Sequence, residues 1–223
     1  MSPVLDDFIA PKCHDEITLL YQDEHILLVN KPSGLLSLSG KNPLNLDSVH
    51  YRLRKEFPGV CMVHRLDFGT SGIMLLAMNK AMNAVLTKQF QDRSVFKTYT
   101  SILMGALKDD QGSIDMPIAK DKPNFPLQKI CYSDGKAALS HYEVIERWSK
   151  PARTKVIFRP ETGRTHQLRI HSQAIGHPIL GCDLYGSTES QLMADRMLLH
   201  ATSLEFVHPF SGVAMHIECP CPF

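Results

Sequence analysis

The chain has 223 residues, of which 43% are hydrophobic and 21% charged, with 13 Gly and 14 Pro. This composition excludes collagen-like, low-complexity and disordered chains, and the net charge of +1 excludes a uniformly basic protein. The apolar run at residues 73–78 is far shorter than the ~20 residues of a membrane-spanning helix. The acidic start at residues 1–7 lacks the pattern of a secretory signal. We therefore expect a cytoplasmic protein that does not cross a membrane.

The first part of the chain predicts an alternation of short strands and helices. In chain order these are a hairpin of strands at residues 17–21 and 26–29, a helix over residues 49–57 capped by Asp47 or Ser48, and strands at 63–66 and 73–78. A second helix follows, capped by Asn79, with Met82, Val85, Leu86 and Phe90 on one side. The loop at residues 30–34, Asn-Lys-Pro-Ser-Gly, follows the second strand directly. Residues 95–104 then alternate like another strand.

Residues 119–129 combine two prolines and three lysines without apolar periodicity. This pattern predicts an exposed, partly stiff loop that could reach a partner. Further elements follow, namely strands at 138–145 and 155–158, a turn at 160–163, helices at 165–175 and 189–197, and a closing hairpin of 199–207 with 215–218.

A strand-rich mixture without regular βαβ alternation predicts the α+β class. We expect one catalytic domain at residues 17–223, with a mixed, largely antiparallel sheet flanked by helices and loops, after an N-terminal extension at residues 1–16. We expect the six cysteines to be reduced thiols, because a chain with its own core and no export signal does not need disulfides. No pair of cysteines has the C-x-x-C spacing of a zinc site, and we expect no metal and no cofactor.

The positive charge is concentrated at residues 97–180, which hold 13 Lys and Arg against 8 Asp and Glu. This excess suits a groove for phosphates, and a solvated basic face fits the charge count equally well.

The segment at residues 64–72, His-Arg-Leu-Asp-Phe-Gly-Thr-Ser-Gly, lies between two apolar strands and is the most informative part of the sequence. Asp67 there could simply cap the turn through backbone amides. Alternatively it is a positioned carboxylate, a nucleophile or general base that needs a nearby cation to stay ionised in a partly desolvated cleft.

A second candidate cluster at residues 163–171, Gly-Arg-Thr-His-Gln-Leu-Arg-Ile-His, places two Arg and two His at the start of a helix. His166 and His171 are five residues apart and diverge around the helix, unlike a zinc-binding pair. The cluster is either a solvated basic face or a site where one Arg pairs a buried carboxylate while the others hold phosphate. In the strand containing Lys97 and Tyr99, packing is the simplest role for the tyrosine.

Together these segments resemble the RluA family of RNA pseudouridine synthases. Residues 64–72 match the family's H-R-L-D-x-x-T-S-G, residues 163–171 match G-R-x-H-Q-L-R-x-H, residues 30–34 match N-K-P-x-G, and residues 97–99 match K-x-Y. Within the family, the short length and residues 123–126 and 128–132 are most similar to the member that gives the family its name. Many relatives carry an S4 RNA-binding domain, for which this chain has no room.

The resemblance implies a reaction in which the glycosidic bond of a uridine in RNA is broken and the uracil is rejoined through carbon 5. Asp67 would act at the sugar, by attacking it or by removing the 2′ proton, and Arg169 would keep Asp67 ionised. Tyr99 would stack beneath the uracil and could take the carbon-5 proton, although a phenol of pKa ~10 is a poor base at neutral pH. Arg65 would occupy the space left by the flipped base.

The resemblance also implies an RNA partner, held by the side chains of His64, Thr70, Arg164, His166 and His171. The composition of residues 119–129 adds Lys120, Lys122 and Lys129 as expected contacts to the RNA backbone. The expected RNA is a transfer RNA anticodon stem-loop, a large-subunit ribosomal RNA hairpin or both, and a paralogue acting on another uridine is the nearest alternative. We expect a monomer, because no heptads or long exposed apolar helix occur. Two rival functions are a catalytically silent RNA-binding protein and an unrelated glycosidic hydrolase using Asp67 with Glu161.

Overall fold

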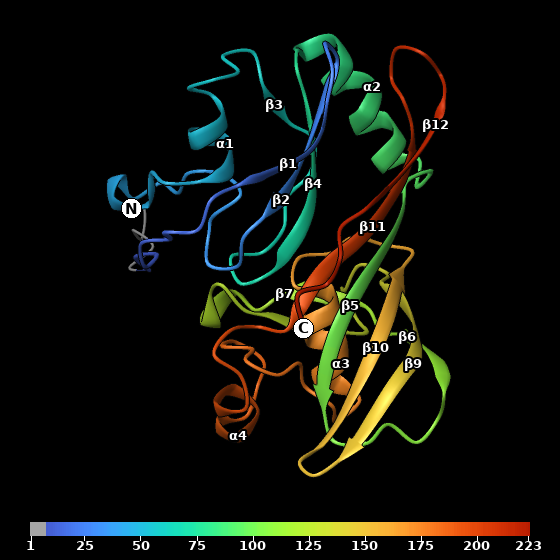
Figure 1. The fold of residues 1–223 in the computed structure, drawn as a ribbon. Helices are drawn as coiled ribbons and strands as arrows, with labels where there is room; N and C mark the ends of the chain where they lie inside the picture. The colour runs from blue at the N-terminus through green and yellow to red at the C-terminus, as the bar shows by residue number, and fades with distance from the viewer. Residues whose placement is uncertain (1–7) are drawn as a thin grey trace. The chain divides into compact units, whose positions relative to one another are not determined.

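Strands form most of the regular structure of residues 8–223, which the computed structural model describes, and four α-helices accompany them (Figure 1). The predicted α+β class is confirmed. The chain divides into two compact units. Unit 1 takes residues up to Val95 together with Ser203–Pro220, and unit 2 takes Phe96–Thr202 together with Cys221–Phe223.

Unit 1 is built on an antiparallel sheet. Its strands are β1 (Thr18–Gln22), β2 (Ile26–Lys31), β3 (Cys61–Met62) and β4 (Ser71–Ala77). Strand β2 lies between β1 and β4, and β3 pairs with β4. Unit 1 also contains a hairpin formed by the end of β11 (Leu199–Val207) and β12 (Ala214–Glu218). The β1–β2 hairpin was predicted, and Asp23 explains its tight turn. The Asp23 carboxylate accepts backbone N–H bonds from His25 at 2.7 Å and from Ile26 at 2.8 Å.

Two helices and a short 3₁₀ helix, η1 (Pro43–Asn45), complete unit 1. The helix α1 (Val49–Leu53) begins at Ser48, whose hydroxyl accepts the Tyr51 amide at 3.1 Å, and it is shorter than predicted. The helix α2 (Lys80–Gln91) begins at the predicted cap, Asn79.

The apolar side of α2 packs on the core of unit 1 as the four-residue spacing predicts, with one exception. Leu86 is buried, and Met82 and Phe90 pack against the same core cluster as Ile73. Val85, which belongs to the same predicted apolar side, is 41% exposed. The strand predicted at residues 63–66 is also wrong, because the strand there is β3, which ends at Met62.

Unit 2 contains a second antiparallel array. Its strands in spatial order are β5 (Phe96–Met104), β10 (Ala152–Pro160), β9 (Leu139–Ser149) and β6 (Gln111–Asp115), and the start of β11 also belongs to this unit. The helices are α3 (Gln167–Ala174) and α4 (Thr188–Leu192). A core that includes Leu103, Phe158 and Leu168 holds these elements together.

The exposed loop predicted at residues 119–129 is instead a small hairpin. Its elements are β7 (Ile118–Lys120), η2 (Lys122–Asn124) and β8 (Gln128–Ile130). Ile118 is buried in the core of unit 2, and Leu127 and Ile130 pack against that core. The hairpin therefore has an apolar inner side, although its lysines remain outside.

No helix within residues 8–223 is long and apolar enough to cross a membrane. All six cysteines are free thiols. The first seven residues of the predicted N-terminal extension lie outside the described residues.

Candidate active site

Asp67 lies in the segment that links β3 to β4. The Thr70 amide donates to the Asp67 carbonyl at 3.1 Å, which closes a four-residue turn with Phe68 and Gly69 at its centre. The turn leaves the Asp67 side chain half-buried. It is the kind of position from which a carboxylate can reach a ligand while its backbone stays fixed.

The loop at residues 30–34 holds this turn by its backbone. The ammonium group of Lys31, on a side chain that is 0% exposed, donates to the Phe68 carbonyl at 3.1 Å and to the carbonyls of Pro32 and Leu35. The Gly34 amide donates to the same Phe68 carbonyl at 2.9 Å, and the Ser33 hydroxyl donates to the Gly69 carbonyl at 2.7 Å. Sequence reasoning found this motif but gave it no role, and the structure makes it the support of the Asp67 turn.

Gly34 has a φ of +75°, a left-handed conformation that a residue with a Cβ rarely adopts. This conformation turns the loop so that the Gly34 amide faces the Phe68 carbonyl. A glycine at this point of the motif is therefore a backbone requirement.

Leu66 and His64, which precede Asp67, are also held in place by hydrogen bonds. The Ser37 hydroxyl donates to the Leu66 carbonyl at 2.7 Å and accepts the Leu66 amide at 3.1 Å. His64 accepts the Leu75 amide at Nε2 and stacks on Phe90 with ring centroids 4.8 Å apart. This imidazole is therefore an anchor of the segment, and its predicted RNA contact stays a prediction.

Arg65 and Thr70 differ in their exposure. Arg65 is exposed, and among residues 8–223 its guanidinium has no hydrogen bond or ion pair. Thr70 is 2% exposed, and its hydroxyl finds no hydrogen-bond partner within the same part of the chain. Arg65 can therefore reach RNA directly, whereas burial argues against a surface contact for Thr70 and leaves its unpaired hydroxyl beside the Asp67 turn.

The described part of the N-terminal extension is tied to unit 1 next to this turn. The Asn45 side chain bonds the Ala10 amide at 2.8 Å and the Phe8 carbonyl at 2.7 Å, as a neighbouring strand would. Arg52 donates to the carbonyls of residues 13 and 15 at 2.6 Å while it pairs with Asp47. Hydrogen bonding to Arg52 is the main cause that lowers the pKa of Asp47.

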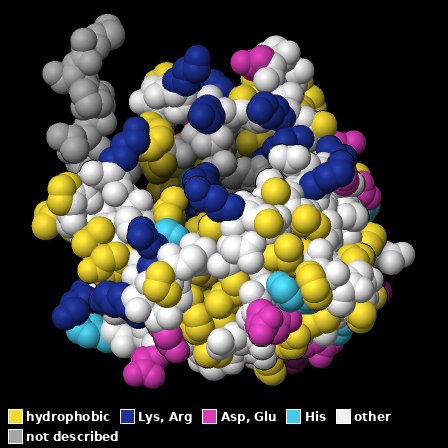
Figure 2. All heavy atoms as spheres, turned by 90° about the horizontal axis from the view of Figure 1, so that it is seen from above, with side chains coloured by type: hydrophobic (Ala, Val, Ile, Leu, Met, Phe, Trp, Pro, Cys, Tyr) yellow, Lys and Arg dark blue, Asp and Glu magenta, His cyan; other side chains and the backbone are white. Residues whose placement is uncertain are grey.

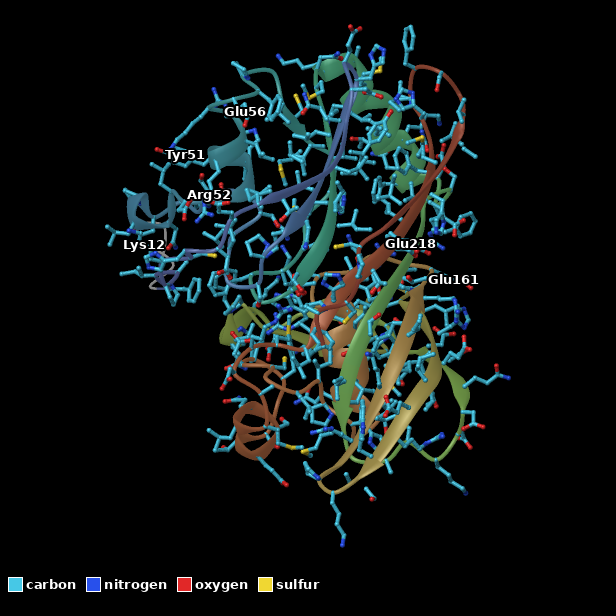
Figure 3. All side chains as sticks on the ribbon, viewed as in Figure 1. Lys12, Tyr51, Arg52, Glu56, Glu161 and Glu218 are labelled. Atoms are coloured by element: carbon cyan, nitrogen blue, oxygen red, sulfur yellow. The ribbon has the colours of Figure 1, made fainter. Side chains whose placement is uncertain are left out.

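A cavity of about 550 Å³ lies between this extension and the Asp67 turn. Phe68 lines it from the turn, Lys12 from the extension, and Tyr51 and Arg52 from α1 (Figure 3). The ring of Phe68 also meets Phe8 edge-on, with centroids 5.5 Å apart. The extension thus contacts the residue that follows Asp67.

Arg169 lies in unit 2, on the first turn of α3, and its side chain is 5% exposed. Its guanidinium forms an ion pair with Asp183 and donates from Nε to the Cys182 sulfur at 3.4 Å. It also lies over the Tyr185 ring, 5.3 Å from the centroid. The predicted pairing of Arg169 with Asp67 stays a prediction, and its contacts with residues 182–185 were not expected from the sequence.

The other residues of the 163–171 cluster mostly build the start of α3. His166 precedes the helix with a left-handed φ of +57°, and its Nδ1 bonds the Tyr185 hydroxyl at 2.8 Å. The Arg164 guanidinium donates to the Ala137 carbonyl at 3.0 Å and remains half-exposed. The half-exposed Arg164 guanidinium has further N–H groups that could bind phosphate.

His171 corrects the sequence interpretation. Its side chain is 0% exposed and bonds the Ser140 hydroxyl and the Met116 carbonyl, each at 3.0 Å. Burial is the main cause that lowers the pKa of this imidazole, which favours the neutral form. A buried, doubly bonded, neutral ring is a structural residue, so this placement argues against the predicted RNA contact.

Tyr99 lies on β5 opposite Phe158 of β10 and packs, half-buried, against the core of unit 2. Two residues earlier, burial lowers the pKa of Lys97. The packing role that the strand pattern predicts for Tyr99 is thus present, and it leaves part of the ring accessible.

The three lysines of the segment that was predicted to be a loop, residues 119–129, all lie on the β7–β8 hairpin. Lys120, Lys122 and Lys129 are exposed, and Lys129 lies 3.9 Å from Asp121 across the hairpin. Phe125, near the tip, is 72% exposed. Exposed cations beside an exposed ring are typical of surfaces that bind single-stranded nucleic acid.

Within the described residues, no three His, Cys, Asp or Glu side chains lie close enough together to hold a metal ion.

Asp67 lies on a turn whose backbone is fixed by hydrogen bonds, and unit 2 carries exposed cations at Lys120, Lys122 and Lys129. The chain belongs to the RNA pseudouridylate synthase family, whose model matches residues 25–174 and so includes parts of both units. The predicted membership is confirmed, and the family's members are isomerases.

Two curated relatives bear the same name, dual-specificity RNA pseudouridine synthase RluA. The protein from Yersinia pestis is 48% identical over 92% of this chain and 99% of its own length, and that from Escherichia coli K12 is 44% identical over 93% and 94%. The solved structure of human RNA pseudouridylate synthase domain containing 1 is 30% identical, with a TM-score of 0.80 over 96% of this chain and 86% of that one. The resemblance to the member that gives the RluA family its name is thus confirmed.

Proposed function

We propose that this RNA pseudouridylate synthase converts specific uridines of structured RNA to pseudouridine through Asp67. The observation that carries the proposal is the Asp67 turn, whose backbone is fixed at Leu66, Phe68, Gly69 and Thr70 by hydrogen bonds. A reacting carboxylate must keep its orientation while the substrate moves, and a locked backbone supplies this.

The reaction conserves atoms and electrons. The bond between N1 and C1′ breaks, the uracil turns, and C5 bonds to C1′. The C5 proton then leaves to solvent and N1 gains one, so neither an oxidant nor an energy source is needed. Asp67 acts at the sugar, either as the nucleophile at C1′ or as the base that removes the 2′ proton. Deuterium at the 2′ position separates these routes, because only proton removal gives a primary isotope effect.

The remaining roles follow the family resemblance. Arg169 keeps the carboxylate ionised, Tyr99 stacks beneath the uracil and receives the C5 proton, and Arg65 fills the space left by the flipped base. The exposure of Arg65, and its lack of a partner among residues 8–223, support this last role.

The proposed substrates are a transfer RNA anticodon stem-loop and a large-subunit ribosomal RNA hairpin, since the curated relatives are named dual-specificity enzymes. The basic side chains favour an anionic partner. Figure 2 shows many Lys and Arg side chains on the face that it presents, spread over its upper half and lower left, together with fewer Asp and Glu. We propose a cytoplasmic monomer with residues 17–223 as its catalytic domain, acting without cofactor or metal.

The test uses RNA tritiated at carbon 5 of its uracils, and tritium release to water is counted for the wild type and for Asp67→Asn. The expected result is release by the wild type alone. Asp92→Asn is the matched control, because that exposed carboxylate at the end of α2 forms a single ion pair within residues 8–223, with Lys88 at 3.1 Å. Separated transfer and ribosomal RNA then identify the substrate.

Other results would overturn the proposal. Binding without tritium release from any RNA would indicate the silent RNA-binding protein. Free uracil would indicate the hydrolase with Glu161, a residue that the structure places in an exposed pair with His141, 2.8 Å away.

A further inference from the structure

Tyr185 lies between α3 and α4 in unit 2, and no motif singled it out. Its side chain is 4% exposed and packs in the core of the unit. The ring and the hydroxyl contact different parts of the candidate site. Tyr185 is therefore the point at which those parts meet.

The hydroxyl joins the β7–β8 hairpin to the start of α3. It accepts the backbone N–H of Gln128, the first residue of β8, at 2.8 Å, and it bonds His166 Nδ1 at 2.8 Å. A phenol has one donor and two acceptor positions, so it satisfies both partners with either tautomer of the imidazole. The hairpin and the helix start are thus linked by a single oxygen atom.

The ring holds the catalytic arginine. The Arg169 guanidinium lies 5.3 Å from the ring centroid, and its ion-pair partner, Asp183, is two residues before Tyr185. His166 adds a second connection, because it immediately precedes the helix whose first turn carries Arg169. Tyr185 therefore touches Arg169 directly and also fixes the helix start that carries it.

Side chains do not fill the space between the hairpin and α3. A cavity of about 380 Å³ is lined by residues of β8, by Ile170 and Gln173 of α3, and by Tyr185. Gln128 and Tyr185 both line this space, so the hydrogen bond between them lies at its wall. Lys129, which follows Gln128, is exposed to solvent.

We propose that Tyr185 is a positioning residue that couples the binding of RNA on the β7–β8 hairpin to the orientation of Arg169. Phosphates drawn to the hairpin lysines tighten the Gln128–Tyr185 bond, and the tyrosine then holds the guanidinium in its working position. The coupling makes the reaction rate depend on whether the RNA is bound by the hairpin, away from the reacting atoms. An RNA that does not contact the hairpin would therefore react more slowly, and the enzyme would select against it. The inference rests on the proposed function.

The test is Tyr185→Phe, which keeps the ring over Arg169 and removes both hydrogen bonds. We expect the single-turnover rate at saturating RNA to fall about tenfold while RNA affinity is unchanged. Tyr142→Phe is the matched control, because Tyr142 is a half-buried tyrosine of the same unit whose hydroxyl makes no hydrogen bond within the described residues. A rate equal to that of the wild type would overturn the inference.

A double-mutant cycle separates coupling from general support. Lys129→Gln should slow the saturated rate of the wild type but should not slow Tyr185→Phe further, because the connection is already broken. Rate losses that multiply independently would assign Tyr185 a purely structural role and refute the coupling.

Amide hydrogen exchange keeps the inference testable should Tyr185→Phe fail to fold. In the wild type, RNA should slow exchange of the Gln128 amide, and unchanged exchange with RNA bound would refute the coupling. The wild type's own tritium release is measured first. If the wild type is inactive, the proposed function fails, whereas an active wild type with an unaffected Tyr185→Phe refutes the coupling alone.

Discussion

Replacing Lys31 with methionine removes the buried ammonium group that supports the Asp67 turn, with little change in side-chain length. The group donates at 2.9 Å to Pro32, 2.7 Å to Leu35 and 3.1 Å to Phe68. Hydrogen bonds from a charged donor contribute about 1.5–3 kcal/mol each, so the three together contribute roughly 5–9 kcal/mol. Burying the ammonium itself costs several kcal/mol. We expect Lys31→Met to lower the free energy of unfolding by about 2–4 kcal/mol.

The assay is urea and thermal unfolding followed by circular dichroism, together with tritium release at saturating RNA. For a chain of this size the expected loss corresponds to a melting temperature about 5–15 °C lower. Activity should fall more than stability explains, because the Phe68 carbonyl next to Asp67 loses a donor. Lys41→Met, at an exposed lysine, is the control and should change neither quantity. A Lys31→Met protein as stable as the wild type would refute the reasoning, since burial would then cost as much as the bonds return.

Three further predictions concern pH and the N-terminal extension. Burial lowers the pKa of His171 below its usual 6.5, so the unfolded chain binds a proton at this imidazole at a higher pH than the folded chain does. The free energy of unfolding should therefore fall as pH drops below about 6.5. His171→Gln should make this pH dependence less steep in urea titrations. Desolvation raises the pKa of Asp23, but the hydrogen bonds to its carboxylate outweigh desolvation and lower the pKa below 3.8. The stability that ionised Asp23 adds is therefore lost as pH falls through the folded-state pKa. Asp23→Asn should flatten the acid end of the plot of unfolding free energy against pH. Arg52→Lys removes the planar guanidinium that bonds the carbonyls of the extension. A protease should therefore cut within residues 8–16 faster in this variant than in the wild type or in Arg54→Lys, a control at an exposed arginine. Equal cleavage rates would contradict this role of Arg52.

Local patterns predicted those parts of the fold that neighbouring residues determine. The Ser48 and Asn79 caps and the β1–β2 hairpin depend on contacts within a few residues, and a single sequence records such contacts. The hairpin at residues 118–130 could not be predicted in this way. Its strands are three residues long, and what holds them is the distant core and the bond from Gln128 to Tyr185.

In the candidate site, too, features set by neighbouring residues were predictable from the sequence, and contacts between distant residues were not. The motif at residues 64–72 indicated Asp67, since a carboxylate in a turn between apolar strands is visible in the sequence. The support from Lys31 was not visible, because lysine is almost never fully buried and its bond to Phe68 spans 37 residues. The pairing of Arg169 with Asp183 lies beyond the reach of helical periodicity for a similar reason.

The division of unit 1 between residues up to 95 and residues 203–220 has a consequence for synthesis on the ribosome. Leu204 and Phe206 belong to the same core as Ile26 and Ile73, so that core cannot be completed until the last strands emerge. The 107 residues of Phe96–Thr202 must be made in between, which takes about 5–20 s at the usual elongation rate. During this delay the nascent chain exposes the apolar faces of β2 and β4. Unit 2, by contrast, has nearly all of its sequence by Thr202, so its core can form before the core of unit 1 is complete.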